Sequence, residues 1–163
     1  MLTNNTDVLI VGAGPTGTTL AIALQQAGVN HLLIDKLDQG QNTSRAAVIH
    51  AHTLEMLEEL GVSSELAKRG MKLANFVIRD RNRALVHLRF DQLPSAYRYL
   101  LMLPQNETEK VLAERLAALG VAVVAEHVPR SRIEAVVVGR GLVELLEQTR
   151  ALVGAHPRGG VLG

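Results

Sequence analysis

The segment Gly12-Ala13-Gly14-Pro15-Thr16-Gly17 is the most informative part of the sequence, because it joins a predicted buried strand to a predicted helix. The residues before it, Val8-Leu9-Ile10-Val11, form a continuous apolar run, which is typical of a parallel strand buried on both faces. Pro15 is tolerated in a first helical turn, and apolar residues at helical spacing continue the predicted helix to Ala27. Gly28 is placed to end that helix in a left-handed turn.

A second apolar run, His31 to Ile34, ends at Asp35 and completes a strand–helix–strand unit. The G-x-G-x-x-G pattern suits a dinucleotide, because its glycines allow a sharp turn, the close approach of a pyrophosphate and tight packing of helix on strand. The N–H groups at the helix start then hold the phosphates. Asp35 follows Gly17 by 18 residues, where a carboxylate accepts hydrogen bonds from an adenosine ribose.

The dinucleotide interpretation leaves two points open on these residues alone. A glycine-rich turn that binds nothing is the structural alternative, although it requires the glycines, the carboxylate and both strands to coincide by chance. Asp35 disfavours a 2′-phosphate at this site, because like charges repel, but it does not separate FAD from NAD.

A hairpin is predicted further along the chain, where Leu73–Ile78 and Ala84–Phe90 flank the polar tetrad Asp80-Arg81-Asn82-Arg83. Apolar and polar residues alternate in the second run, which predicts a hairpin with one face in water. The other predicted helices cover residues 52–60, 63–70, 106–119 and 142–150, and the other predicted strands cover 99–103, 121–125 and 133–138. Ser63 is expected to cap one of these helices, and Asn106 with Glu109 resembles a capping box at the start of another.

Composition excludes several classes of function. The formal net charge is +1 and the aromatic content is 2%, which argues against a nucleic-acid partner. The sequence has no cysteine, no signal-peptide pattern and no apolar run long enough to span a membrane, so we expect a cytoplasmic protein without a membrane partner. His50 and His52 lack accompanying metal-binding carboxylates, so solvent-facing histidines are expected there and no metal site is predicted.

Three segments together carry a resemblance to a known family: residues 7–35, the segment that begins Ser44-Arg45-Ala46 and runs to residue 57, and Leu103-Pro104-Gln105-Asn106-Glu107-Thr108-Glu109. In this order and at these separations, the chain resembles the N-terminal part of the FAD-dependent aromatic hydroxylases. These are single-component flavoprotein monooxygenases of the p-hydroxybenzoate hydroxylase type. The resemblance covers roughly residues 7–126.

The resemblance implies an α/β fold, with a Rossmann-like FAD-binding domain built on a parallel sheet and a β-hairpin of an incomplete substrate-side sheet. It implies FAD as cofactor, NAD(P)H as reductant and an aromatic or related small molecule as substrate. By the same resemblance, Gly12 to Gly17 hold the pyrophosphate and Asp35 the adenosine ribose. Lys36 lies near the adenosine, Arg45 near the phosphates and the ribityl region, and Gln105 beside the ribityl chain.

Domain limits follow from the same resemblance. The FAD-binding domain is expected over residues 1–126, with residues 71–103 on the substrate side, and residues 127–163 form a poorly matching tail. Members of the family are usually much longer than 163 residues, and the Asp-Gly and Gly-Asp dipeptides expected of the later flavin-contacting motifs do not occur here. We therefore expect a truncated or frame-disrupted form that is incomplete for catalysis, and the sequence does not predict its oligomeric state.

Alternatives remain for both the residues and the function. Without the resemblance, Arg45 is equally well a solvated loop residue and Gln105 an ordinary helix start. The alternative functions are an NAD-dependent dehydrogenase-type Rossmann domain and a non-catalytic FAD-binding remnant. No residue is assigned as a catalytic acid, base or nucleophile.

Overall fold

The computed structural model describes part of the chain, namely residues 6–35, 48–124 and 136–138. The chain divides into two compact units. The first unit holds residues 1–38 and 116–163, and the second holds residues 39–115.

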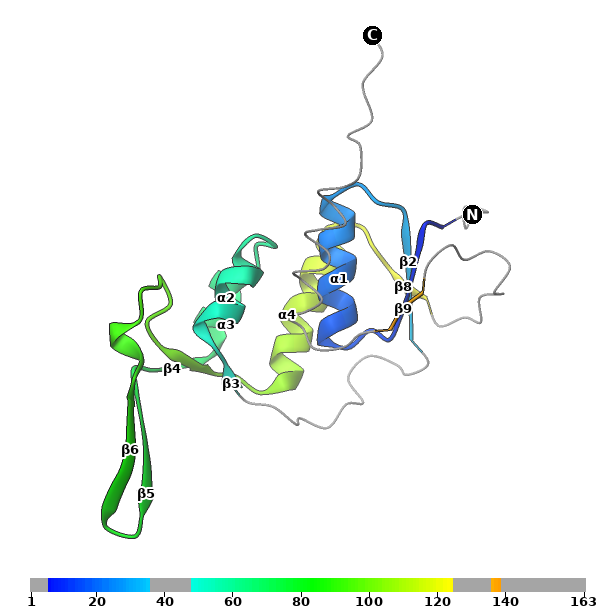
Figure 1. Cartoon of the computed structure of the whole chain (residues 1–163). Helices are drawn as coiled ribbons and strands as arrows, with labels where there is room; N and C mark the ends of the chain where they lie inside the picture. The colour runs from blue at the N-terminus through cyan, green and yellow to red at the C-terminus, as the bar shows by residue number, and fades with distance from the viewer. Residues whose placement is uncertain (1–5, 36–47, 125–135, 139–163) are drawn as a thin grey trace. The chain divides into compact units, whose positions relative to one another are not determined.

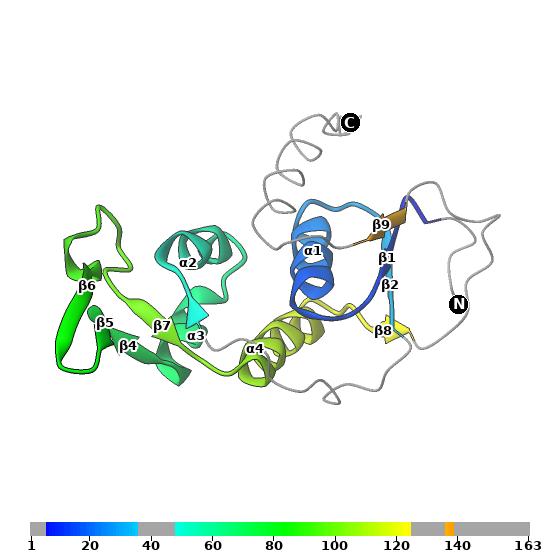
Figure 2. The same ribbon diagram turned by 60° about the horizontal axis from the view of Figure 1, so that its bottom comes forward.

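The first unit contains a four-stranded sheet in which all neighbouring strands are parallel. Its strands are β1 (Val8–Val11), β2 (His31–Ile34), β8 (Val123–Val124) and β9 (Val136–Val138). They lie in the order β8-β2-β1-β9 (Figure 2). The sheet confirms the predicted α/β class with a parallel sheet, and β1 and β2 have the bounds predicted from their apolar runs.

Helix α1 (Pro15–Gln26) connects β1 to β2 and lies alongside both strands (Figure 1). Pro15 is its first residue, as predicted, and Gly28 follows its end with φ +72°, a left-handed conformation that favours glycine. Four apolar residues of α1 are buried at 5% exposure or less: Leu20, Ala21, Ile22 and Leu24. Together with Ile10 of β1 and Leu33 of β2, which are 1% and 0% exposed, they belong to the core of the first unit.

The order of the strands identifies the place, at the carboxyl ends of the strands, where a ligand is expected. The chain leaves β1 toward β2 and β8 on one side, and β9 lies on the other side of β1. Ligands of open parallel sheets bind outside the carboxyl ends of the strands at such a switch of direction. The glycine loop, residues 12–17, begins at the carboxyl end of β1, so it lies where the strand order changes direction.

The second unit combines helices with a three-stranded antiparallel sheet. The sheet has the order β3-β7-β4, formed by β3 (Val48–Ile49), β7 (Leu100–Met102) and β4 (Met71–Leu73). The helices are α2 (Ala51–Glu58), α3 (Ser63–Arg69), the short 3-10 helix η1 (Phe90–Gln92) and α4 (Gln105–Ala118), whose last residues belong to the first unit. The most deeply buried side chains of this unit are Leu54, Leu57, Val62, Leu66, Leu101 and Leu112.

Both predicted helix caps in the second unit are wrong. Ser63 lies inside α3, after the N-cap Val62, and its hydroxyl donates to the carbonyl of Leu54 in α2 instead of capping its own helix. Asn106 lies inside α4, which begins one residue earlier, at Gln105. Ser63 is thus the first residue of its helix rather than the cap, and Asn106 the second residue of its own, so the local capping preference does not determine either boundary.

The predicted hairpin is present as β5 (Asn75–Asp80) and β6 (Arg83–Arg89), but two of its predicted features are wrong. Leu73 pairs with Leu100 in the other sheet, so β4 is separate from β5. Every residue of β5 and β6 is exposed, so among the described residues neither face is covered (Figure 1). Alternation determines which side chains share a face, but the covering of a face requires a second layer.

Candidate cofactor site

The glycine loop turns away from β1 at Gly12. Its φ is +104°, a conformation that glycine adopts without steric cost, and its N–H donates to the carbonyl of Ile34 at 2.8 Å. This hydrogen bond extends the pairing of β1 with β2 by one residue. The chain therefore leaves the sheet at a fixed point, beside the end of β2.

Gly17 is required by packing inside the protein. A Cβ atom at this position would lie 1.9 Å from the carbonyl oxygen of Gly12 and 3.3 Å from the Ile10 side chain. Any side chain would therefore push α1 away from β1. This agrees with the predicted role of the third glycine, the close packing of helix on strand.

No contact that the structure describes requires a glycine at position 14. Its φ of −70° is available to every residue, and a Cβ atom there would meet no described atom within 4 Å. Open space beside the backbone at this point fits the predicted role of the second glycine, which is to let a diphosphate approach the main chain.

The start of α1 offers hydrogen-bond donors. Its N-cap, Gly14, supplies no side-chain cap, and no described group accepts from the backbone N–H of Gly14, Thr16 or Gly17. These donors lie at the positive end of the helix dipole, which favours an anion. The diphosphate of a dinucleotide is an anion of this kind.

Asp35 lies beside the loop, at the end of β2. One carboxylate oxygen, Oδ2, accepts a hydrogen bond from the backbone N–H of Ala13 at 2.6 Å, and the Asp35 N–H donates to Val124 of β8 at 3.3 Å. The structure therefore brings the predicted carboxylate to the glycine loop. The N–H of Ala13 is occupied by this contact and is not among the donors that face the open space.

The other three predicted residues are Lys36, Arg45 and Gln105. Lys36 and Arg45 lie outside the described residues. Gln105 is half-buried in the second unit, at the start of α4, and its side-chain Nε2 donates to Glu109 at 2.8 Å. The capping-box partner Glu109 is thus used by a side chain rather than by the backbone.

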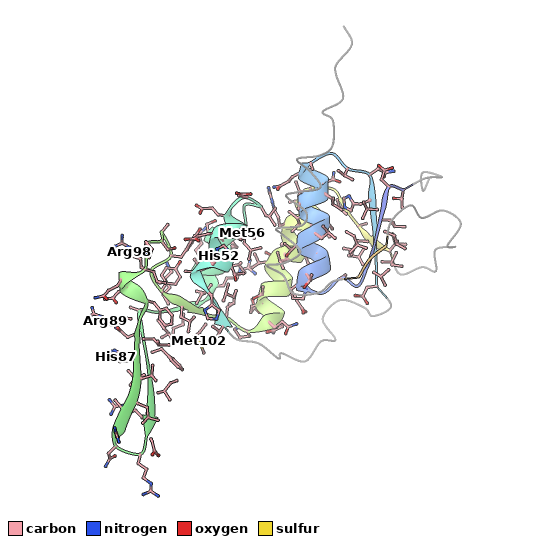
Figure 3. All side chains as sticks on the ribbon, viewed as in Figure 1. His52, Met56, His87, Arg89, Arg98 and Met102 are labelled. Atoms are coloured by element: carbon pink, nitrogen blue, oxygen red, sulfur yellow. The ribbon has the colours of Figure 1, made fainter. Side chains whose placement is uncertain are left out.

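The described part of the chain holds neither a metal-binding cluster nor a helix that could cross a membrane. No group of three or more His, Cys, Asp or Glu residues in the described part could hold a metal ion. The side chain of His52, on α2 (Figure 3), is 61% exposed, and its Nδ1 lies 3.5 Å from Oε2 of Glu55. Among the described residues, no helix has both the length and the apolar character needed to cross a membrane.

Sequence reasoning missed Thr18, which lies in α1 directly after the glycine motif. Its side chain is buried at 5% exposure, and its hydroxyl donates to the carbonyl of Ala13 at 3.0 Å. The sequence could have indicated this residue through a pair of threonines, Thr18 and Thr19, in a helical segment that otherwise consists of small and apolar residues from Gly17 to Leu24.

Comparisons with known proteins show what the chain is similar to. The family model described as "FAD binding domain" matches residues 5–134. The chain is 44% identical over 120 residues to 6-methylpretetramide 4-monooxygenase of Streptomyces rimosus, covering 71% of this chain and 21% of the relative. It is 38% identical over 112 residues to pentachlorophenol 4-monooxygenase of Sphingobium chlorophenolicum, covering 68% of this chain and 21% of the relative.

A solved structure supports the same fold. The crystal structure of p-nitrophenol 4-monooxygenase from Pseudomonas putida DLL-E4 matches with a TM-score of 0.69 and 26% identity, covering 74% of this chain and 31% of that chain. The chain thus spans about a fifth of the length of the two curated relatives, at 21% of each.

Proposed function

This chain belongs to the FAD-binding domain family, which matches it over residues 5–134, and on that premise we propose that Gly12–Gly17 and Asp35 hold the ADP half of FAD. The observation that carries the proposal is the open space at Gly14 beside the N–H groups of the first turn of α1. The protein itself needs no glycine there, whereas a diphosphate that approaches the backbone does.

The loop and the carboxylate have different roles in this proposal. The N–H groups of Gly14, Thr16 and Gly17 donate to the phosphate oxygens, and the helix dipole favours their negative charge. Asp35 accepts from a ribose hydroxyl as well as from Ala13, because an ionised carboxylate has several acceptor positions. The loop therefore binds the charge, and the carboxylate positions the sugar.

Three further residues complete the proposed cofactor contacts. Lys36 is placed near the adenosine, and Arg45 near the phosphates and the ribityl region, where its planar guanidinium suits an anion. Gln105 is placed beside the ribityl chain, because a side-chain amide both donates to and accepts from hydroxyl groups.

We propose that the chain serves the NAD(P)H-dependent hydroxylation of an aromatic or related small molecule in the cytoplasm, where this reductant is available, through FAD binding, and that, as its sequence leads us to expect, it is incomplete for catalysis by itself. The names of the relatives support this, since two are 4-monooxygenases of 6-methylpretetramide and of pentachlorophenol. Bound FAD supplies the redox chemistry, while the protein binds and orients it. Within this activity, the described residues bind the cofactor, and none of them is assigned to the chemical step.

Titration of the full chain with FAD and, separately, with NAD tests the proposal. We expect FAD to bind and NAD to bind much more weakly. Bleaching of the flavin absorbance when NADPH is then added without oxygen would show that the chain also carries out the reductive step. NAD binding without FAD binding would contradict the proposal and favour a dehydrogenase-type domain. FAD binding without reduction would limit the function to cofactor binding.

A pair of matched variants tests the role of the carboxylate. Asp35→Asn keeps the shape of the side chain but removes its charge, and we expect about a tenfold weaker affinity for FAD because a charged acceptor is lost. Asp7→Asn removes the same charge at the other end of the sheet, before β1, and we expect it to leave the affinity unchanged. Equal losses in both variants would show only a general effect of charge.

A further inference from the structure

Thr18 has a buried hydroxyl that the glycine motif does not explain. Its side chain is 5% exposed, its Oγ1 donates to the Ala13 carbonyl at 3.0 Å, and its own N–H donates to the Gly14 carbonyl at 3.0 Å. The hydroxyl reaches out of α1 to the loop, five residues back along the chain. An ordinary threonine in a helix bonds to a carbonyl three or four residues back inside its own helix.

The carbonyl of Ala13 belongs to the same peptide unit as the N–H of Gly14. A trans peptide unit is planar, and its C=O and N–H point in opposite directions. When Thr18 holds the carbonyl toward α1, the N–H of Gly14 must therefore point away from α1. The main chain is open at this residue, since a Cβ atom of Gly14 would meet no described atom within 4 Å.

Among the residues that the structure describes, little else holds this peptide unit in place. Gly14 has no Cβ atom, so rotation about its φ is less restricted than at any other residue. Asp35 holds the preceding peptide through the N–H of Ala13, but it does not hold the carbonyl. If the unit turned over, a carbonyl oxygen would replace the N–H donor and would repel a phosphate.

We propose that Thr18 is a positioning residue for the FAD diphosphate, because its hydroxyl fixes the Ala13–Gly14 peptide so that the Gly14 N–H faces the phosphates. This inference rests on the proposed function and adds a residue to it. Thr18 does not touch the cofactor in this arrangement and acts only through the Ala13–Gly14 peptide.

The chain offers a matched control in the next residue. Thr19 is 0% exposed, and its hydroxyl donates to the Pro15 carbonyl at 2.6 Å, within α1. Thr18→Val and Thr19→Val each replace a buried hydroxyl by a methyl group of similar size. Only Thr18→Val releases a carbonyl that precedes α1, because Pro15 is already the first residue of the helix. Thr18→Ser restores the hydroxyl.

The test measures the Kd for FAD and the urea midpoint of each variant of the full chain. We expect about a tenfold higher Kd for Thr18→Val, the effect of one charge-assisted hydrogen bond, with Thr18→Ser and Thr19→Val within about twofold of wild type. Equal losses of affinity in both valine variants, in step with their urea midpoints, would overturn the proposal. An unchanged Kd for Thr18→Val would overturn it as well.

A second measurement separates this inference from the proposed function. Inorganic pyrophosphate is titrated into the ¹⁵N-labelled chain while the Gly14 amide resonance is followed. We expect the resonance to shift in wild type and in Thr19→Val, and to shift much less in Thr18→Val. A shift in a wild-type chain that fails to bind FAD would reject FAD as ligand but keep the role of Thr18, whereas equal shifts, or no shift, in all of the variants would reject that role.

Discussion

The glycine loop after β1 and the β5–β6 ribbon both reverse the chain, yet their environments are opposite. At the loop, Gly17 lies against the carbonyl of Gly12, and Ala13 is held by Asp35 through its N–H and by Thr18 through its carbonyl. In the ribbon every side chain is exposed, including large apolar ones such as Phe76, at 43%, and Leu85, at 55%. Apolar sequence alone therefore does not show where a chain gains stability.

The two regions also differ in what their sequences serve. Most of the loop is determined by contacts inside the protein, and the exception, Gly14, is the position that we assign to the cofactor. The ribbon keeps its strand pairing from Asn75 and Arg89 to Asp80 and Arg83, although no described layer covers it. An isolated two-stranded ribbon is at best marginally stable in water, so we expect it to open more readily than the sheet around β1.

A pair of leucine truncations tests this comparison with the largest expected effect. Leu33→Ala removes a side chain that is 0% exposed, and we expect about 3 kcal/mol loss in the free energy of unfolding through lost burial and a cavity. Leu88→Ala removes one that is 43% exposed, and we expect less than about 0.5 kcal/mol. Urea unfolding followed by circular dichroism measures both, and similar losses would show that the ribbon is covered in solution.

Gly17→Ala should have the next largest effect. The added Cβ atom would meet the backbone carbonyl of Gly12, which cannot turn aside as a flexible side chain can. We expect a loss of about 2 kcal/mol in stability, typical of overpacking, together with a loss of FAD affinity because the loop is displaced. The same unfolding measurement tests it, and wild-type stability would mean that the loop has more freedom than its contacts indicate.

Arg81→Gly in the ribbon turn should have the smallest effect and the opposite sign. Arg81 has φ +48°, the left-handed region, in which a side chain costs about 1 kcal/mol relative to glycine. We expect slower amide hydrogen exchange in β5 and β6 and an unchanged urea midpoint for the chain. Faster exchange in the ribbon would show that the Arg81 side chain stabilises the turn.

The sequence predicted those parts of the fold in which local pattern and burial agree. β1, α1 and β2 follow from two continuous apolar runs and from glycines at fixed positions, and the spacing of Asp35 places its carboxylate at the loop. The pairing of β5 with β6 was predictable for a different reason, the alternation of apolar and polar residues beside a polar tetrad, which requires no burial. Their exposure was not, because it depends on whether a second layer is present, which the alternation of residues does not encode.

The unpredicted parts of the site depend on the orientation of single groups. The bond from Ala13 to Asp35 and the bond from Thr18 to Ala13 require a particular rotation of one peptide unit, and the spacing of glycines does not specify it. Gln105 was expected at a helix start and lies there, but its amide contacts Glu109, which the capping pattern had assigned to the backbone. Its proposed contact with FAD stays a prediction, as do those of Lys36 and Arg45.

The most direct test of the central claim compares FAD affinity with protein stability in Gly14→Ala. The added methyl group meets no described atom, and the backbone conformation suits alanine, so we expect stability to be unchanged or about 0.5 kcal/mol higher. The same methyl group would occupy the space assigned to the diphosphate, so we expect the Kd for FAD to rise at least about tenfold. FAD binding as tight as in wild type would contradict the account, because the cofactor would then not approach the backbone at Gly14.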